Sequence, residues 1–405
     1  MGRKILVTAT TFPRWKDDTE PGFVFYLSNL LSKKGHKVTA LVPHHFNAKR
    51  YELMGNIKVY RFPYFYPYKL QKLCYDGGIL ENMKKSIFAK IQAPFLFLAE
   101  LINMKKIIQK EKIDLIHAHW ILPQGVLAAL FKKIFNMPYI ITVHAGDIFP
   151  IKSPFFRYLS KMALQNCDYC TANSSYTKNA VLNIVQIDKI KVIPMGVDLG
   201  LFSKNKKNNA LRKKFKIKGK LILSVGRLAE KKGIKYLIKA MPDVLKKFPD
   251  AKLMIVGDGP EKENITRLIS ELRVSKNVIL AGKIRNRELP AYYATADVFA
   301  GPSIITKKGD TEGLGVVFLE ALASGTCVIG SNVGGIPDII KNRKTGLLVP
   351  QKNSIELGNA IIEVLTNKTL RDQMIENGNR HIKKNFSWNN VAEKFDNLIE
   401  KIGQF

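Results

Sequence analysis

The sequence predicts an α/β protein with two Rossmann-like domains. With 405 residues the chain is too long for one hydrophobic core, which favours two domains of roughly 200 residues each. Residues 4–43 have the pattern of a buried strand, a loop, a helix and a second strand, which is the start of a parallel βαβ unit. The same pattern begins again at residues 221–240. We therefore expect an N-terminal domain over residues 1–196 and a C-terminal domain over residues 197–385.

The chain carries a formal net charge of +32, which is spread over both predicted domains. Lys and Arg outnumber Asp and Glu by 28 to 12 in residues 1–196 and by 37 to 21 in residues 197–405. This excess suits an anionic ligand or an anionic surface, although a generally Lys-rich composition would produce the same total. The sequence has no recognised nucleic-acid-binding module and no clustered charge, so we expect no nucleic acid partner.

The first strand of the N-terminal domain is followed by a loop over residues 10–20 and by a helix that begins at Gly22. A glycine in the first turn of a helix allows a ligand to approach the free N–H groups closely. A helix that simply begins after Pro21 would have the same sequence. No signal peptide precedes the first strand, so we expect a cytoplasmic protein.

Residues 60–110 combine aromatic and apolar side chains with scattered lysines. Two interpretations stay open: a packed loop with a surface helix, or a segment that lies against an anionic membrane or holds a lipid-linked acceptor. The most apolar stretch, residues 87–104, is interrupted by polar residues and a proline, so we expect no membrane span there. The interrupting residues are Lys90, Gln92, Pro94 and Glu100.

Three histidines lie at the ends of predicted strands in the N-terminal domain. His117 and His119 alternate on one face of their strand, and His144 ends the next strand, three residues before Asp147. Ligands of open α/β sheets collect at this carboxyl edge. A metal site would use such residues, but neutral imidazoles in the wall of a cleft need no metal. A structural histidine held by its neighbours is the alternative for His144.

The four cysteines are too few for a disulfide framework in a chain of this length. Cys167 and Cys170 have CxxC spacing, but no second pair or histidine cluster completes a zinc site. We expect buried free thiols.

Two cations follow the first strand of the C-terminal domain. Arg227 and Lys232 lie on one loop before a helix, where they could clamp a diphosphate. Two solvated surface charges are the alternative. Residues 257–263 look like a dinucleotide fingerprint but lack its third glycine, so a nicotinamide cofactor is not indicated.

Residues 310–350 contain two carboxylates around a glycine-rich helix start. Glu312 precedes Gly313-Leu314-Gly315, and Glu320 lies in the apolar run VVFLEALA that follows. A glycine-rich helix N-terminus can bind a phosphate or a sugar hydroxyl, and a carboxylate can accept both hydroxyls of a ribose. The alternative is an amphipathic helix with one capping and one solvated Glu. A charge at Glu320 without a partner would be costly, which favours the ligand-binding interpretation.

The segment EGLGVVFLEALASG, residues 312–325, resembles the donor-binding signature of the family-4 retaining glycosyltransferases. The resemblance extends over nearly the whole chain. It implies the GT-B fold, in which two Rossmann-like domains face one another across an inter-domain cleft. It also implies that the chain passes between domains at residues 191–202 and that a C-terminal helix, residues 386–405, crosses back onto the first domain.

The resemblance also implies roles for single residues. It places His144 beside the reacting sugar, Arg227 and Lys232 on the leaving phosphates, and Glu312 on the sugar hydroxyls. We expect His119 and Asp147 on the acceptor side. The expected donor contacts are Gly22, Arg227, Lys232, Lys283, Ile284, Glu312, Gly313, Leu314, Gly315, Val316 and Glu320. The family more often has two adjacent glycines where this chain has Pro21-Gly22.

We therefore expect a glycosyltransferase that moves a hexosyl unit from a UDP- or GDP-linked sugar to a glycan or lipid-linked acceptor in cell-surface polysaccharide or glycolipid synthesis. Retention of anomeric configuration follows from the resemblance alone. The chain has no DxD sequence, and Asp310-Thr-Glu312 precedes a helix rather than ending a strand, so we expect no metal and no other cofactor. A peripheral contact with the inner face of the membrane stays an open possibility. A sugar-nucleotide epimerase on the same two-lobed fold is the alternative function.

Overall fold

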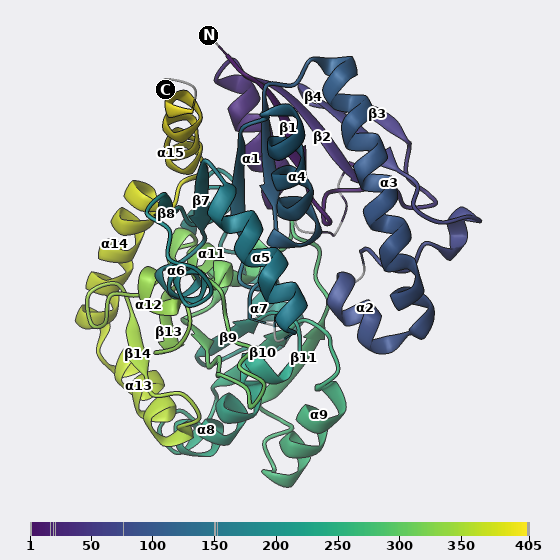
Figure 1. Ribbon diagram of the computed structural model, residues 1–405. Helices are drawn as coiled ribbons and strands as arrows, with labels where there is room; N and C mark the ends of the chain where they lie inside the picture. Colours follow the sequence, from purple (N-terminus) through teal and green to yellow (C-terminus); the bar gives the residue numbers. More distant parts are fainter. Residues whose placement is uncertain are drawn as a thin grey trace. The chain divides into compact units, whose positions relative to one another are not determined.

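The computed structural model describes residues 2–16, 18, 20, 22–75, 77–149, 151 and 153–402. The chain folds into two compact units. The first comprises the described residues up to Ile193 together with those from Val391 onward, and the second comprises Pro194–Asn390. The sequence-based boundaries were 196/197 and 385/386. Each unit is a β-sheet with a parallel core, flanked by helices (Figure 1), and this confirms the two Rossmann-like α/β domains.

The N-terminal unit has an eight-stranded sheet in the order β3-β4-β2-β1-β5-β6-β7-β8. All neighbouring strands are parallel except β3 and β4. The strands are β1 Lys4–Thr8, β2 Lys37–Pro43, β3 Tyr51–Met54, β4 Ile57–Phe62, β5 Leu115–His119, β6 Tyr139–Val143, β7 Tyr169–Ala172 and β8 Ile190–Val192. Strand β1 lies between β2 on one side and β5 on the other, so the strand order reverses at β1. The carboxyl ends of β1 and β5 therefore form a switch point, where ligands of open α/β sheets bind.

The helices of this unit cover both faces of the sheet. They are α1 Phe23–Lys33, α2 Ile79–Lys85, α3 Ile87–Glu111, α4 Val126–Phe135, α5 Pro154–Asn166, α6 Ser175–Leu182 and α15 Trp388–Lys401. Residues of α3, α4 and α5 form one hydrophobic core with β5 and β6, and these helices lie on the near side of the sheet in Figure 1.

The last helix, α15, packs on the N-terminal unit. Its buried Phe395 lies against the ring of His117, with 5.2 Å between centroids. Asp396 binds His36 Nε2 at 2.8 Å and Lys34 Nζ at 3.1 Å. His117 therefore lies on the sheet face opposite the α3–α5 core. Of the predicted returning segment, residues 403–405 fall outside the described part of the chain.

Helix α3 is the longest helix in the part of the chain that the structure describes. It runs unbroken for 25 residues with Pro94 inside it. By length and apolar composition alone, α3 is the one helix in the described ranges that could cross a membrane, a test that a core helix of a soluble protein also passes. Pro94 does not end the helix, because a proline removes one hydrogen bond while the turns on either side keep theirs.

The C-terminal unit has a six-stranded parallel sheet in the order β11-β10-β9-β12-β13-β14. The strands are β9 Leu221–Val225, β10 Lys252–Val256, β11 Val278–Gly282, β12 Val298–Gly301, β13 Cys327–Ser331 and β14 Leu347–Val349. The helices are α7 Asn209–Lys214, α8 Ile234–Lys247, α9 Lys262–Glu271, α10 Leu289–Thr295, α11 Val316–Ala323, α12 Ile336–Ile339, α13 Ser354–Thr366 and α14 Lys368–Asn385. The strand order reverses between β9 and β12, so their carboxyl ends form the switch point of this sheet. All four cysteines are buried and unpaired, as predicted.

Candidate functional site

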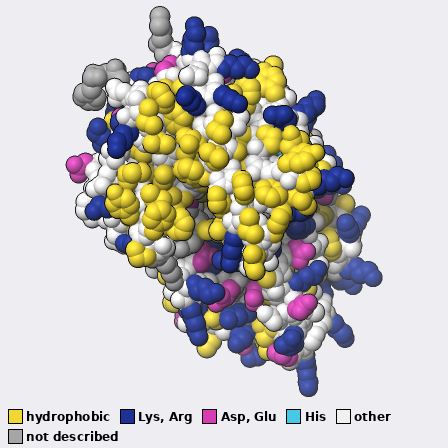
Figure 2. Space-filling model, turned by 45° about the vertical axis from the view of Figure 1, so that its right-hand side comes forward, with side chains coloured by type: hydrophobic (Ala, Val, Ile, Leu, Met, Phe, Trp, Pro, Cys, Tyr) yellow, Lys and Arg dark blue, Asp and Glu magenta, His cyan; other side chains and the backbone are white. Residues whose placement is uncertain are grey.

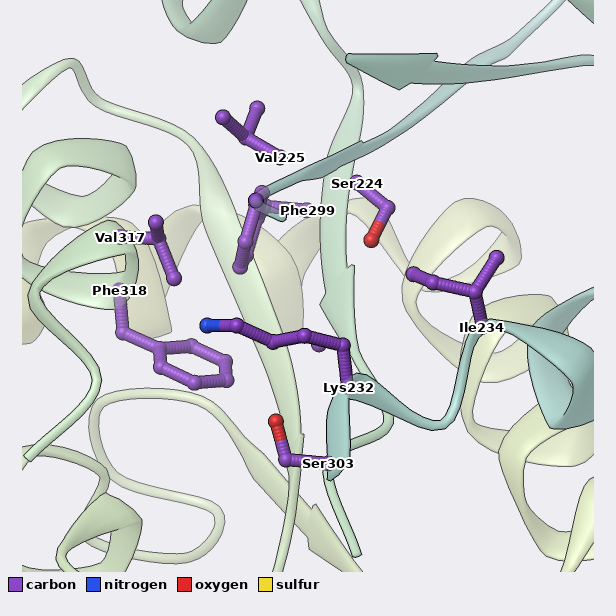
Figure 3. Close-up of a pocket in the computed structure, with 10 residues that line it drawn as sticks. Ser224, Val225, Lys232, Ile234, Phe299, Ser303, Val317 and Phe318 are labelled. Atoms are coloured by element: carbon purple, nitrogen blue, oxygen red, sulfur yellow. The ribbon is translucent and has the colours of Figure 1, made fainter. Parts of the chain in front are cut away.

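A small pocket lies at the switch point of the C-terminal sheet (Figure 3). Its walls come from the ends of β9 and β12 and from the start of α11. The lining residues include Ser224, Gly226, Lys232, Phe299, Ser303 and Phe318. This is the position at which the sheet topology alone would place a ligand.

Lys232 points into this pocket. In Figure 3 its side chain extends away from Ile234, and its amino group lies near Phe318. Gly226 has φ +151°, and a Cβ atom there would lie 3.2 Å from Lys232 Cε. The glycine after β9 therefore leaves the space through which the lysine reaches the pocket.

Lys232 and Glu312 form an ion pair at this site. Lys232 Nζ donates to Glu312 Oε2 at 2.6 Å, and the two side chains are only 17% and 16% exposed. Burial on its own would raise the pKa of Glu312, but the positive charges of Lys232 and Lys231 outweigh it and hold this pKa below its ordinary value. Glu312 is therefore a carboxylate at neutral pH. The sequence analysis placed both residues at the donor site but did not predict an ion pair between them.

A second glycine turn fixes the backbone of Glu312. The N–H of Gly335 donates to the carbonyl oxygen of Glu312 at 3.0 Å. Gly334 has φ +57°, and a Cβ atom there would come within 2.1 Å of the same oxygen. Only glycine fits at residue 334, so this turn after β13 positions a carboxylate from a different loop.

Helix α11 begins directly after the expected glycines. The apolar pattern of the sequence predicts a helix from Leu314, but Gly315 is the N-cap with φ +90° and the first helical residue is Val316. A helix cannot include a residue with this φ, which accounts for the later start. The N–H groups of Gly313, Leu314, Gly315 and Val316 thus lie at or just before a helix N-terminus, whose partial positive charge favours an anion.

Glu320 has a protein partner that the sequence did not reveal. Tyr293 from α10, itself fully buried, donates its hydroxyl to Glu320 Oε2 at 2.7 Å. Burial raises the pKa of Glu320 to about 7, against the opposing effects of the Tyr293 hydrogen bond and the Lys232 charge. The sequence indicated that Glu320 needs a hydrogen-bond donor, because it is a carboxylate in an apolar run, but it did not identify Tyr293 as that donor.

The other predicted donor contacts lie on loops at the same sheet edge. Arg227 follows β9 with an exposed side chain, outside the pocket lining, and it makes no side-chain hydrogen bond or ion pair within the described part of the chain. Lys283 and Ile284 follow β11 at the outer edge of the sheet. Lys231, which the sequence left unassigned, pairs with Asp310 at 3.1 Å. Of the two predicted phosphate-binding cations, only Lys232 points into the pocket.

In the N-terminal unit the three histidines form a stack. His119 Nδ1 lies 3.0 Å from His144 Nε2, and their rings are stacked with centroids 5.2 Å apart. The ring of His117 lies 4.3 Å from that of His119, and its Nε2 atom is hydrogen-bonded to Thr142. Burial lowers the pKa of His117 and that of His144 to about 3, with the neighbouring His117 contributing to the second shift. Burial also lowers the pKa of His119 well below its ordinary value, so all three rings are neutral at physiological pH.

Asp147 holds the loop that carries His144. Its carboxylate accepts hydrogen bonds from the N–H of His144 at 2.9 Å and from that of Ile121 at 3.0 Å. Burial raises the pKa of Asp147 to about 6. Asp147 is 8% exposed and His119 is 1% exposed. Both side chains bond to protein groups, which favours a positioning role for them over the predicted contact with an acceptor.

His144 is half-buried beside the start of α1. Its ring lies 5.0 Å from that of Phe23 and 4.9 Å from that of Trp120. Gly22 is the N-cap of α1 and immediately precedes Phe23, so the structure brings Gly22 and His144 to the same edge of the sheet. Gly22 has φ −88°, a value open to any residue, and Pro21 lies outside the described residues.

The stacked histidines do not converge on a common point. Among the residues that the structure describes, no group of three or more His, Cys, Asp or Glu side chains has the arrangement of a metal site. The half-buried, neutral imidazole of His144 at the switch point can donate a hydrogen bond to a substrate hydroxyl or accept one from it.

Comparisons with known proteins cover both units. The family description "Glycosyltransferase Family 4" matches residues 23–201, and "Glycosyl transferases group 1" matches residues 206–381. The chain is 30% identical over 392 residues to an uncharacterized glycosyltransferase of Methanocaldococcus jannaschii, with 92% of each chain covered. It is 28% identical over 302 residues to the GDP-mannose-dependent alpha-(1-6)-phosphatidylinositol monomannoside mannosyltransferase of Mycobacterium tuberculosis, which covers 74% of this chain and 78% of the relative.

A solved structure of sucrose-phosphate synthase from Thermosynechococcus elongatus has the same fold, with a TM-score of 0.78, 23% sequence identity and 99% of each chain covered. The strand orders, the glycine-started helix with its two carboxylates and the sequence relatives agree. The chain is therefore a glycosyltransferase that belongs to glycosyltransferase family 4 and has the GT-B fold.

Proposed function

We propose that the protein transfers a hexosyl unit from a GDP- or UDP-linked sugar to a lipid-linked or glycan acceptor, with retention of anomeric configuration and without a metal ion. The observation that supports this most directly is the Lys232–Glu312 ion pair at the start of α11, at the switch point of the C-terminal sheet. The named mannosyltransferase relative uses GDP-mannose and a phosphatidylinositol monomannoside. Its name supports a nucleotide-sugar donor and a lipid-linked acceptor for synthesis of a glycolipid or polysaccharide.

The Lys232–Glu312 pair provides both the charge and the hydroxyl contact that this reaction needs. The leaving nucleoside diphosphate gains negative charge as the glycosidic bond breaks, and a preorganised cation stabilises that charge. In the proposal Lys232 exchanges Glu312 for the diphosphate, and the N–H groups before α11 bind the same phosphates. Glu312 is then free to accept hydrogen bonds from the sugar hydroxyls. Arg227, with its exposed side chain, can reach the diphosphate from the β9 loop.

Glu320 is the proposed ribose ligand. One of its oxygens already accepts the Tyr293 hydroxyl, and two ribose hydroxyls can donate to the remaining lone pairs. Hydrogen bonds donated to a carboxylate favour its ionised form. Because the pKa of Glu320 is about 7 in the free protein, donor binding should release a proton near neutral pH.

His144 is the proposed contact from the N-terminal unit. As a neutral ring it cannot supply a positive charge, but it can hydrogen-bond a hydroxyl of the donor sugar. This role fits front-face attack, in which the departing phosphate accepts the acceptor's proton and no enzyme nucleophile is used.

A thermal-shift screen with GDP-mannose, UDP-glucose and ADP-glucose tests the donor site. A donor that binds only the folded protein raises its melting temperature. Lys232→Ala should abolish the shift, and Lys239→Ala, an exposed lysine on α8, should leave it intact. Equal shifts in both variants would remove the site assignment. Product analysis with and without an acceptor then separates transfer from epimerisation, which would change the donor sugar in the absence of an acceptor.

Metal independence is tested by activity in EDTA. We expect the rate to stay within about twofold of the untreated rate, because Lys232 and the α11 N-terminus supply the positive charge. Loss of activity in EDTA that Mg²⁺ or Mn²⁺ restores would contradict this part of the proposal.

A further inference from the structure

Helix α3 of the N-terminal unit exposes a continuous apolar surface. Seven of its large apolar residues are between 37% and 75% exposed, and six of them, all except Phe97, have a spacing of one, three or four residues that places them on one side of the helix. These six residues, which we call the outer face of α3, are Ile87, Phe88, Ile91, Phe95, Leu98 and Ile102. The side of the molecule that carries α3 turns forward in Figure 2, where hydrophobic side chains cover much of the surface and lysines and arginines border it.

Two polar residues within the apolar stretch of this helix, Gln92 and Glu100, face inward. Gln92 is fully buried, where it donates to the carbonyl of Leu70 at 2.6 Å and accepts from the N–H of Lys72 at 3.0 Å. Glu100 is also fully buried and accepts from Gln124 at 3.2 Å. A helix whose outer side meets only water normally has the opposite polarity, with apolar residues inside and polar residues outside.

The charges around the outer face are positive. All residues of α3 are described, and between Ile87 and Ile102 its only acidic residue is the buried Glu100. At the far end, Glu111 is bound to Lys58 and Tyr60. Exposed lysines lie near both ends of the apolar stretch, namely Lys85, Lys90 and the Glu81-paired Lys84 at one end and Lys105, Lys106 and Lys110 at the other. An apolar band between two groups of lysines matches the acyl and headgroup layers of an anionic membrane surface.

An aromatic loop extends this surface. The ring of Phe65 lies 5.3 Å from that of Phe88 and 5.7 Å from that of Phe95, both edge-on. The next residue, Tyr66, is 79% exposed. Tyrosine combines an apolar ring with a hydroxyl and is enriched where a membrane meets water.

We propose that the outer face of α3 docks the enzyme onto a bilayer that contains anionic phospholipids. The helix lies in the plane of the interface and does not cross the bilayer. Crossing would break the hydrogen bonds of Gln92 and Glu100 to the rest of the unit and would carry a glutamate into the acyl region. The apolar stretch from Ile87 to Ile102 spans about 24 Å of helix, enough for the whole band to contact one leaflet.

Vesicle co-sedimentation of the full chain tests the proposal. Vesicles of phosphatidylcholine mixed with phosphatidylglycerol should bind the protein, and vesicles of phosphatidylcholine alone should bind it much more weakly. The variant I91Q/L98Q should reduce binding to the mixed vesicles by about tenfold or more, because two side chains lose their contact with the acyl layer. The matched control L53Q/I355Q changes one equally exposed leucine and one isoleucine elsewhere and should bind like the wild type.

Charge reversal provides a second arm. K105E/K106E should weaken binding to mixed vesicles and flatten its dependence on salt. Equal binding by I91Q/L98Q and its control, or no vesicle binding at any lipid composition, would overturn the proposal. The proposal would also be overturned if the wild-type protein bound no vesicles but formed a concentration-dependent dimer that I91Q/L98Q abolished. The outer face of α3 would then be a dimer interface. The donor-induced thermal shift, measured on the same variants, confirms folding and tests the proposed function separately from membrane docking.

Discussion

The pH dependence of donor binding tests the assigned role of Glu320. The pKa of this carboxyl is about 7 in the free protein because burial disfavours its charge. If the ribose requires the carboxylate, only about a tenth of the protein is competent at pH 6 and about nine tenths at pH 8. The donor dissociation constant should therefore fall about tenfold over this range, which corresponds to about 1.4 kcal/mol of binding free energy.

Removing the Tyr293 hydroxyl should shift this pH dependence in a known direction. The 2.7 Å hydrogen bond from Tyr293 favours the ionised form of Glu320, so Tyr293→Phe should raise the pKa and move the midpoint upward by about one pH unit. The matched control is Tyr292→Phe. Tyr292 is adjacent in the chain but packs against Phe215, so its variant should keep the wild-type midpoint.

Isothermal titration with the donor, repeated between pH 5.5 and 8.5, measures the affinity. Repeating it at pH 7 in two buffers of different ionisation enthalpy counts the protons released, and we expect about half a proton per donor. A dissociation constant that does not change with pH would refute the role of Glu320 in ribose binding. A midpoint that moves downward in Tyr293→Phe would refute the assigned direction of the hydrogen bond's effect.

Three further variants test other parts of the site and the fold. Lys232→Ala should lower kcat/KM by a factor of about 100 to 1,000, while Lys239→Ala stays near wild type in the same steady-state assay. Gly334→Ala should lower the melting temperature and weaken donor binding, because a Cβ atom 2.1 Å from the carbonyl oxygen of Glu312 forces that loop to move; unchanged affinity would show that the turn does not position Glu312. Burial raises the pKa of Glu100 to about 8, so folding stability should fall between pH 5 and 8 as the unfolded chain loses this proton and the folded protein keeps it. Glu100→Gln should remove most of this loss of folding free energy, which is roughly 3 kcal/mol at pH 7. Equal urea midpoints for the wild type and Glu100→Gln at pH 7 would contradict this prediction.

The general plan of the molecule could be predicted because it depends on local patterns. Buried strands, glycine turns and amphipathic helices are each encoded within about twenty residues, so the two α/β units followed from the sequence. The glycines before α11 also identified Glu312 and the helix N-terminus as a candidate site. Cys167 and Cys170, which lacked the partners of a metal site, were predicted to be free and buried, and they are.

The pairing of side chains within the site could not be predicted. Lys232 and Glu312 are 80 residues apart, and Tyr293 and Glu320 are 27 residues apart, so each contact depends on the order of strands in the sheet rather than on a local pattern. The sequence treated Arg227 and Lys232 as one clamp. In the structure Arg227 is exposed, whereas Lys232 is half-buried and paired with Glu312.

The surface of α3 was hidden for a different reason. Apolar residues occur on both sides of this helix, so periodicity cannot tell which side faces the core. Gln92 and Glu100 would normally mark the outer side. Their buried hydrogen bonds, together with the exposure of Ile91 and Leu98, show that the side with Gln92 and Glu100 faces the core.

A crystal structure with the bound nucleotide sugar tests the central claim most directly. The account predicts the diphosphate at the start of α11, with Lys232 Nζ about 3 Å from a phosphate oxygen and no longer paired with Glu312, whose carboxylate contacts the sugar. A diphosphate bound elsewhere, or a Lys232–Glu312 ion pair that persists at 2.6 Å beside the bound donor, would contradict it.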